Sequence, residues 1–287
     1  ENPGCSLVYS PNNMFFYRGS LFDIDNASRI KKTVSIVICT YGRPESLNET
    51  LKSLSQQTYR NFEIVLITEK GHLSELRDKG LRASVGRIVS FIDDDVYCPP
   101  TWLYGVVKSF RKGVLGVTGP TTISEEYQRN RDCFKYKSIR KFQEWLFKVP
   151  STPGTLSVCG APSMASNFTE CNYEGFVEYL ECCNMSVLRE EAIRIGGFDH
   201  EYIRTSEWCE VDLAKRLGSY GTLWFSSRIR LEHRPSQQGI YNARLSTGHR
   251  WKNFTRFQYR WVRGGVRRCL YQAFVWTYFK IKELGWI

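Results

Sequence analysis

Three apolar runs in the first third of the chain predict buried strands. Residues 33–39, TVSIVIC, form a continuous β-branched run, and residues 62–68 and 87–92 have the same character. Runs without polar alternation are typical of strands that are buried on both faces of a parallel sheet. The sequence therefore predicts three neighbouring parallel strands here.

Segments with helical spacing separate these runs. Pro44 opens a segment in which Leu47, Leu51 and Leu54 recur at helical spacing, and a second helix is expected over residues 72–84. Strands that alternate with helices imply right-handed βαβ units and an α/β fold with helices on both sheet faces. In such a sheet, ligands bind beyond the carboxyl ends of the strands.

The remaining pattern is less regular. Residues 1–30 show no clear period and predict an irregular arm, and residues 120–175 are mixed, with a helix expected near 131–147. We expect a strand over 177–188 and a capped helix over 206–221, followed by two short strands in TLWF and RIRLEH.

Charge divides the chain into parts. The composition, with 42% apolar and 24% charged residues, is globular and excludes disordered and collagen-like proteins. Most of the net charge of +11 belongs to residues 240–287, which hold ten Lys or Arg and one Glu. We therefore expect an arm over 1–30, a main domain over 31–239 and a basic tail over 240–287.

The basic tail interleaves cations with aromatic residues. Its apolar stretch, residues 269–279, is shorter than the ~20 residues that cross a bilayer, so an amphipathic helix on an anionic membrane surface is expected. The alternative is that its aromatic side chains pack on the main domain. Nucleic acid is not an expected partner, because acidic residues at the sheet edge would repel its phosphates.

Ten cysteines without a C-x-x-C pair predict no zinc ribbon. Cys39 and Cys182 lie in runs that resemble core, which favours free thiols and a reducing compartment. Five N-x-S/T sequons point weakly the other way. We expect a cytoplasmic protein, peripheral at the cytoplasmic face of a membrane if the tail binds one.

Asp93, Asp94 and Asp95 follow the third predicted strand and give the sharpest chemical signal. Three adjacent carboxylates repel one another unless a cation or hydrogen-bond donors offset their charge. A divalent ion such as Mg²⁺ or Mn²⁺, carried with a diphosphate, would do so. The alternative is a solvated acidic turn before a helix.

A second acidic group lies in the predicted helix over 206–221. Glu207 and Glu210 are spaced to share a helix face, and an acid in a cleft near apolar side chains suits a general base. For Asp212, an ion pair with Arg216 is an equal alternative. His233 could ligate a cation or bind phosphate, and Arg77 could pair with a nucleotide, although structural roles are common for both residue types.

Four segments in order resemble the family 2 glycosyltransferases of the GT-A fold. They are VSIVICTYGRPESLNETLKSLSQQTYRNFEIVLI, GRIVSFIDDDVYCPPTWL, CCNMSVLREEAIRIGGFDHEY and EVDLAKRL followed by GTLWF and EH. The resemblance covers about 200 residues, from roughly Thr33 to His233. It implies a Rossmann-like mixed sheet flanked by helices, with the basic tail as a helical addition.

The resemblance also implies roles for the donor-binding residues. Thr40 and Tyr41 match residues that contact the nucleotide base, and Arg77 matches a basic residue that assists there. Glu69 stands where an Asp usually accepts a hydrogen bond from the base. Asp93 to Asp95 match the D-x-D motif that binds ribose and the metal, so Asp93 and Asp94 are expected at the donor.

For catalysis, the resemblance points to the later segments. Asp94, Asp95 and His233 are the expected metal ligands. Glu210 falls where the family has its catalytic base, and Asp212 matches the following acid of that helix. Cys209 and Glu210 replace the usual Glu-Asp pair, so the acid is one methylene longer.

The implied reaction is an inverting transfer of a sugar from a nucleoside diphosphate donor, with a UDP-sugar favoured, to a hydroxyl acceptor. The acceptor would be a growing glycan, a lipid-linked group or a protein, and Mn²⁺ or Mg²⁺ would be the cofactor. Two alternatives stay open: a metal-dependent nucleotidyl or phosphoryl transferase, and a catalytically silent binding protein of the same fold.

Overall fold

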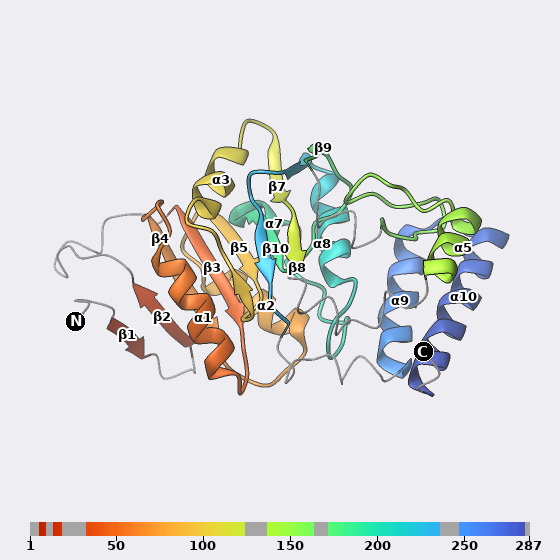
Figure 1. Cartoon of the computed structure of the whole chain (residues 1–287), viewed down its shortest axis with the longest axis horizontal. Coiled ribbons are helices and arrows are strands. Elements are labelled where there is room, and N and C mark those ends of the chain that lie inside the picture. Colours follow the sequence, from red (N-terminus) through yellow and green to blue (C-terminus); the bar gives the residue numbers. More distant parts are fainter. Residues whose placement is uncertain are drawn as a thin grey trace.

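A mixed sheet forms the centre of the protein in the computed structural model, which describes residues 6–9, 14–18, 33–123, 137–163, 172–235 and 247–284 (Figure 1). In spatial order its strands are β1 (Ser6–Tyr9), β2 (Met14–Arg18), β4 (Phe62–Ile67), β3 (Val34–Cys39), β5 (Ile88–Ile92), β10 (Asn184–Leu188), β7 (Val114–Thr118), β11 (Thr222–Ser226) and β9 (Glu174–Phe176). β3 pairs in parallel with β4 and β5, whereas β10 runs antiparallel to β5 and β7. The predicted α/β fold with a mixed sheet is confirmed.

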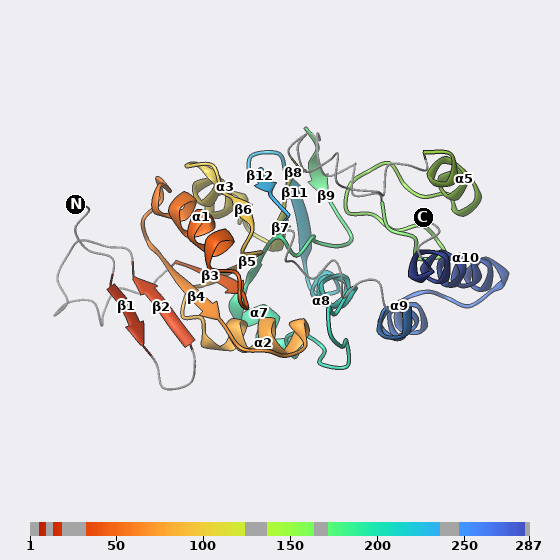
Figure 2. The same ribbon diagram turned by 60° about the horizontal axis from the view of Figure 1, so that its bottom comes forward.

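Helices cover both faces of this sheet (Figure 2). One face packs against α1 (Pro44–Ser55) and α3 (Trp102–Ser109), and the other packs against α2 (Leu73–Ala83), α7 (Arg189–Arg194) and α8 (Cys209–Gly218). Alternate residues of β3 serve the two cores, because successive side chains of a strand point to opposite faces. Both faces of β3 are therefore buried, as its apolar run predicts.

A small second sheet lies beside the end of β5. It consists of β6 (Val96–Tyr97), β12 (Leu231–His233) and β8 (Thr121–Ile123). His233 of β12 is the register partner of Val96 in β6, and the Arg234 amide donates a hydrogen bond to the Asp95 carbonyl at 2.8 Å. This pairing brings the late end of the main domain next to the three aspartates.

Several predicted elements differ from the observed ones. Two segments of the expected irregular arm are strands, since β1 and β2 pair with each other and β2 extends the sheet beside β4. The strand expected over 177–188 is confined to β10, and the helix expected over 206–221 is shortened to α8. Of the helix expected near 131–147, α5 (Lys137–Phe147) is observed, and residues 131–136 lie outside the described part.

The described part of the basic tail forms two helices, α9 (Thr247–Trp261) and α10 (Val266–Glu283). α9 packs along residues 199–212 of the main domain. Asn253 exchanges two hydrogen bonds with the backbone of Ile203, at 2.9 and 3.0 Å, and Trp208 stacks on Phe257 with ring centroids 4.8 Å apart. For α9, the alternative of aromatic packing on the main domain is thus the observed one.

Charged contacts reinforce this docking. Arg256 and Arg260 both pair with Asp199, at 2.7 and 3.0 Å. α5 and α10 add an apolar cluster of their own, which includes Phe147, Tyr271 and Phe279. Among the described helices, none combines the length and the apolar character that crossing a membrane requires.

Candidate active site

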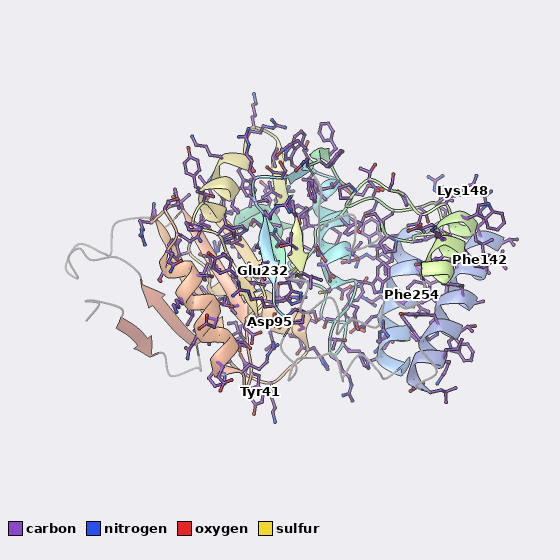
Figure 3. The ribbon with its side chains drawn as sticks, in the orientation of Figure 1. Tyr41, Asp95, Phe142, Lys148, Glu232 and Phe254 are labelled. Atoms are coloured by element: carbon purple, nitrogen blue, oxygen red, sulfur yellow. The ribbon has the colours of Figure 1, made fainter. Side chains whose placement is uncertain are left out.

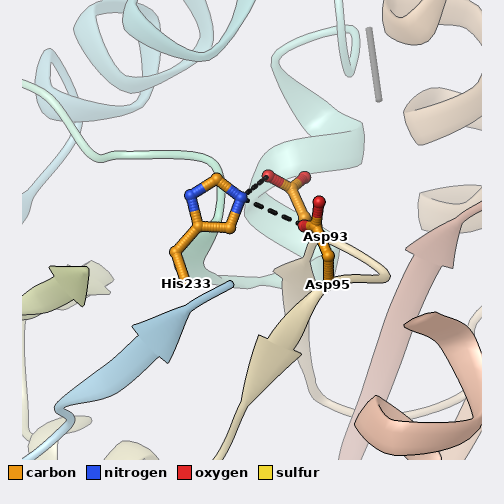
Figure 4. Close-up of side chains that lie close together, drawn as sticks. All are labelled: Asp93, Asp95 and His233. Carbon is orange, nitrogen blue, oxygen red and sulfur yellow. Dashed lines mark hydrogen bonds and ion pairs between the residues drawn. The ribbon is translucent and has the colours of Figure 1, made fainter. Parts of the chain in front are cut away.

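The three aspartates lie at the carboxyl edge of the parallel strands, directly after β5. His233 reaches them from β12, and its Nε2 is 3.0 Å from Asp95 Oδ1 and 4.0 Å from Asp93 Oδ2 (Figure 4). One ligand atom from each of these three side chains lies within 4.8 Å of the others. Two carboxylate oxygens and an imidazole nitrogen at this spacing fit a divalent cation.

The observed cluster differs from the expected metal site by one residue. Asp95 and His233 are in the cluster, as predicted, but Asp93 takes the place of Asp94. Asp94 is completely buried, accepts a hydrogen bond from Thr40 Oγ1 at 2.5 Å and pairs with Arg43 at 2.6 Å. Burial raises the pKa of its carboxyl to about 6, against the lowering effects of Thr40 and Arg43. The structure thus places the expected metal ligand Asp94 outside the cluster of Asp93, Asp95 and His233, with its carboxyl directed toward Thr40 and Arg43.

Arg43 is a site residue that the sequence analysis missed. It is the residue before Pro44, at the start of α1, and its guanidinium lies 2.6 Å from Asp94 and 3.3 Å from Asp95. The signal was available in the TYGRP turn, because this turn also follows a strand at the ligand edge. Arg43 offsets part of the mutual repulsion of the aspartates, so a divalent ion is not their sole compensation.

Arg77 lies at the base of the site on α2 and is buried. One guanidinium nitrogen is 3.7 Å from Asp93 Oδ1, and the other donates to Cys209 Sγ at 3.7 Å. Arg77 also interacts electrostatically with Glu210. It therefore connects the aspartate cluster with the start of α8, a location deeper than the nucleotide contact expected of it.

Glu210 is half-buried in the first turn of α8. The helix begins at Cys209 because Trp208 takes a left-handed backbone conformation, with φ of 78°, while its ring is held against α9. The Cys209 thiol lies 3.5 Å from Glu210 Oε2. Glu207 precedes the helix and pairs with Arg250 at 3.4 Å, so the expected helix face shared by Glu207 and Glu210 is not formed.

Asp212 is fully buried and faces the tail helix. Arg216 pairs with it at 2.9 Å, Arg260 at 3.2 Å, and Trp261 Nε1 donates to Oδ1 at 2.7 Å. The expected ion pair with Arg216 is thus present. Both carboxylate oxygens have protein partners, and these contacts attach α8 to α9. The catalytic role expected of Asp212 stays a prediction.

We expect Asp212→Ala to lower the free energy of unfolding by about 3 kcal/mol, since it removes the buried carboxylate that pairs with Arg216 and Arg260. Urea denaturation of the variant and of the wild type measures this difference. Asp212→Asn retains the hydrogen-bond acceptor for Trp261 and should cost less. An unchanged stability in both variants would contradict a structural role.

The remaining predicted donor contacts lie at the ends of β3 and β4. Tyr41 is exposed, with Lys70 Nζ 4.8 Å from its ring centroid, and Glu69 pairs with Lys79. Thr40 is buried, and its hydroxyl binds Asp94. The exposed Tyr41 ring remains a predicted stacking surface for a base, and Glu69 a predicted acceptor.

Comparisons with known proteins agree with this arrangement. Residues 35–70 and 68–166 match the family described as Glycosyl transferase family 2. The match spans just under half of the chain, which is similar to that family over this range. The Haloferax volcanii protein named glucosyl-dolichyl phosphate glucuronosyltransferase is 22% identical, and the match covers 84% of this chain and 75% of that protein.

The fold of the chain is also found in solved structures. The mannosyltransferase PcManGT from Pyrobaculum calidifontis, in complex with GDP-Man and Mn²⁺, superposes with a TM-score of 0.53 at 13% identity, over 90% of this chain and 74% of that one. GalNAc-T7 with UDP, GalNAc and Mn²⁺ gives 0.50 at 11% identity, over 72% and 44%. The predicted GT-A fold is therefore confirmed.

Proposed function

We propose that this protein is a glycosyltransferase that moves a sugar from a nucleoside diphosphate donor to a hydroxyl group of a lipid-linked acceptor and inverts the anomeric centre. The observation that carries the proposal is the position of Asp93, Asp95 and His233 at the ligand edge of the sheet, next to the helix that presents Glu210. The name of the Haloferax volcanii relative, which contains a dolichyl phosphate, supports the lipid-linked acceptor.

Asp93, Asp95 and His233 would hold a Mn²⁺ or Mg²⁺ ion together with the donor diphosphate. The chemistry that such an ion supplies when bound is stabilisation of the negative charge on the leaving diphosphate. Arg43 holds Asp95 in place, and Arg77 does the same for Asp93. The site thus has fixed ligands before the donor binds.

Glu210 would act as the general base. It takes the proton of the acceptor hydroxyl, whose oxygen forms the new bond to the anomeric carbon. The bond between that carbon and the diphosphate oxygen breaks, and the nucleoside diphosphate leaves with the electron pair. Attack from the face opposite the leaving group inverts the anomeric configuration.

The donor is tested by thermal unfolding with UDP, GDP and dTDP, each with Mn²⁺ or with EDTA. A ligand at 100 times its dissociation constant stabilises the folded state by about 2.7 kcal/mol. We expect one nucleotide, with UDP favoured, to raise the melting temperature in Mn²⁺ and to do so far less in EDTA. If none of the three changes the melting temperature, the proposed donor class is wrong.

The reaction products distinguish sugar transfer from the two alternative functions, nucleotidyl transfer and silent binding. Sugar transfer from a nucleoside diphosphate sugar releases the nucleoside diphosphate, whereas nucleotidyl transfer from the same compound moves the nucleoside monophosphate and releases the sugar phosphate. A silent binding protein would release neither product. The protein is incubated with the sugar derivative of the nucleotide that raises its melting temperature. Chromatography of the products then separates the three functions.

A further inference from the structure

Helix α5 presents an apolar face without a protein partner among the described residues. The exposed fractions of Phe142, Trp145 and Leu146 are 52%, 74% and 40%. Positions i, i+3 and i+4 lie on one side of a helix, so these three side chains form one surface. The rings of Phe142 and Trp145 are 6.0 Å apart, and we refer to this surface as the α5 face.

The opposite side of α5 anchors the helix to the rest of the protein. Phe147 is buried and contacts Tyr271 and Phe274 of α10, with ring centroids 4.9 and 5.3 Å away. Figures 1 and 2 both show α5 beside α10, at the end of the molecule farthest from β1. The α5 face is thus displayed on a helix that is already packed, and its side chains are not needed for that packing.

Cations border the α5 face. Lys141 and Lys148 are exposed and come directly before and shortly after its residues in the chain, and Figure 3 shows Phe142 and Lys148 at the outer end of the molecule. Residues 137–148 contain four Lys or Arg and one Glu. Neighbouring α10 adds exposed Arg267. Aromatic and aliphatic side chains bordered by lysines are typical of helices that lie in the headgroup region of an anionic bilayer.

We propose that the α5 face docks on an anionic bilayer surface, with Trp145 and Phe142 at headgroup depth and Lys141 and Lys148 against the lipid phosphates. This inference rests on the proposed function, because a lipid-linked acceptor presents its hydroxyl at such a surface. The sequence analysis expected the basic tail to contact the membrane. The proposal assigns this contact to α5, which precedes the tail, because α9 of the tail packs on the main domain.

The test is cosedimentation of the full chain with phosphatidylcholine vesicles that contain or lack phosphatidylglycerol, without any donor. The wild type should bind the anionic vesicles, and binding should weaken as salt is added, since exposed charges are screened. Phe142→Ser combined with Trp145→Ser should reduce the affinity for vesicles at least ~10-fold, because the double variant lacks two apolar side chains that binding would bury in the bilayer. Lys141→Gln with Lys148→Gln should reduce it by a similar factor on anionic vesicles only.

Tyr104→Ser is the matched control. Tyr104 is 50% exposed on α3, away from α5, and should leave vesicle binding unchanged. The same preparations are assayed for transfer to a short-chain, water-soluble acceptor, where the α5 variants should retain wild-type rates. On an acceptor embedded in vesicles, the α5 variants should be slower by the factor lost in binding.

Three results would overturn the inference: a wild type that does not bind anionic vesicles, double variants that bind as well as the wild type, and a dimer in sedimentation equilibrium that the serine variants dissociate. The last result would assign the α5 face to a second copy of the chain. Failure of the proposed function is separate, because it appears as absent transfer to the soluble acceptor while vesicle binding is unaffected.

Discussion

Glu210→Gln is expected to bind the donor nucleotide as the wild type does and to transfer sugar about 10³-fold more slowly. The amide keeps the size of the side chain but cannot accept the acceptor's proton, and general base catalysis contributes roughly 10² to 10⁴ in rate. Turnover under saturating donor measures the loss in rate. Nucleotide-induced thermal stabilisation checks that binding is retained.

Glu190→Gln is the matched control for this variant. Glu190 is an exposed acid in the first turn of α7, so it shares the helix position and the chemical change but not the site. It should retain wild-type turnover. Near-normal turnover in Glu210→Gln would show that another carboxylate acts as the base, and Glu207 would be the next candidate.

Asp95→Asn is expected to weaken Mn²⁺ binding by roughly 10²-fold and to remove most metal-supported transfer, since a neutral amide is a poor ligand for a divalent cation. Asp95 contacts both Arg43 and His233, so its loss also releases the two side chains that frame the site. Titration of Mn²⁺ in the presence of nucleotide, followed by electron paramagnetic resonance, gives the affinity directly.

Asp94→Asn provides the comparison from the adjacent position. Because the Asp94 carboxyl points into the protein, we expect this variant to retain its affinity for Mn²⁺ and to lose conformational stability, as Arg43 then lacks its closest partner. Equal loss of Mn²⁺ affinity in both variants would show that the two aspartates bind the ion together, contrary to the geometry.

The sequence predicted the strands of the parallel region well. β3, β4 and β5 were expected within one or two residues, since their apolar runs have no competing helical interpretation. β1 and β2 were missed because strands of 4 and 5 residues are too short for a recognisable alternation of apolar and polar positions. The α8 start was placed too early, since the left-handed residue before it depends on Trp208 packing against a distant helix.

The sequence predicted which residues lie at the candidate site better than it predicted how they are arranged. Adjacent aspartates look equivalent in a sequence, and only the fold of the turn decides that Asp93 and Asp95 face His233 while Asp94 faces Thr40. The partners of Arg43, and those of Asp212 in α9, were out of reach for a different reason. These contacts join residues that are between 48 and 52 positions apart in the chain, and local spacing carries no signal for them.

The charge composition places a boundary at residue 240, but α9, which follows this boundary, packs on the main domain. A chain shortened at that point would leave Asp199 and Asp212 without the guanidinium groups of Arg256 and Arg260, and the Trp208 ring without its cover. The segment from Gly197 to Glu210, which leads into the proposed base, is held by those contacts. Helix α9 therefore belongs to the same folded unit as the candidate site, and this unit extends at least to Trp261.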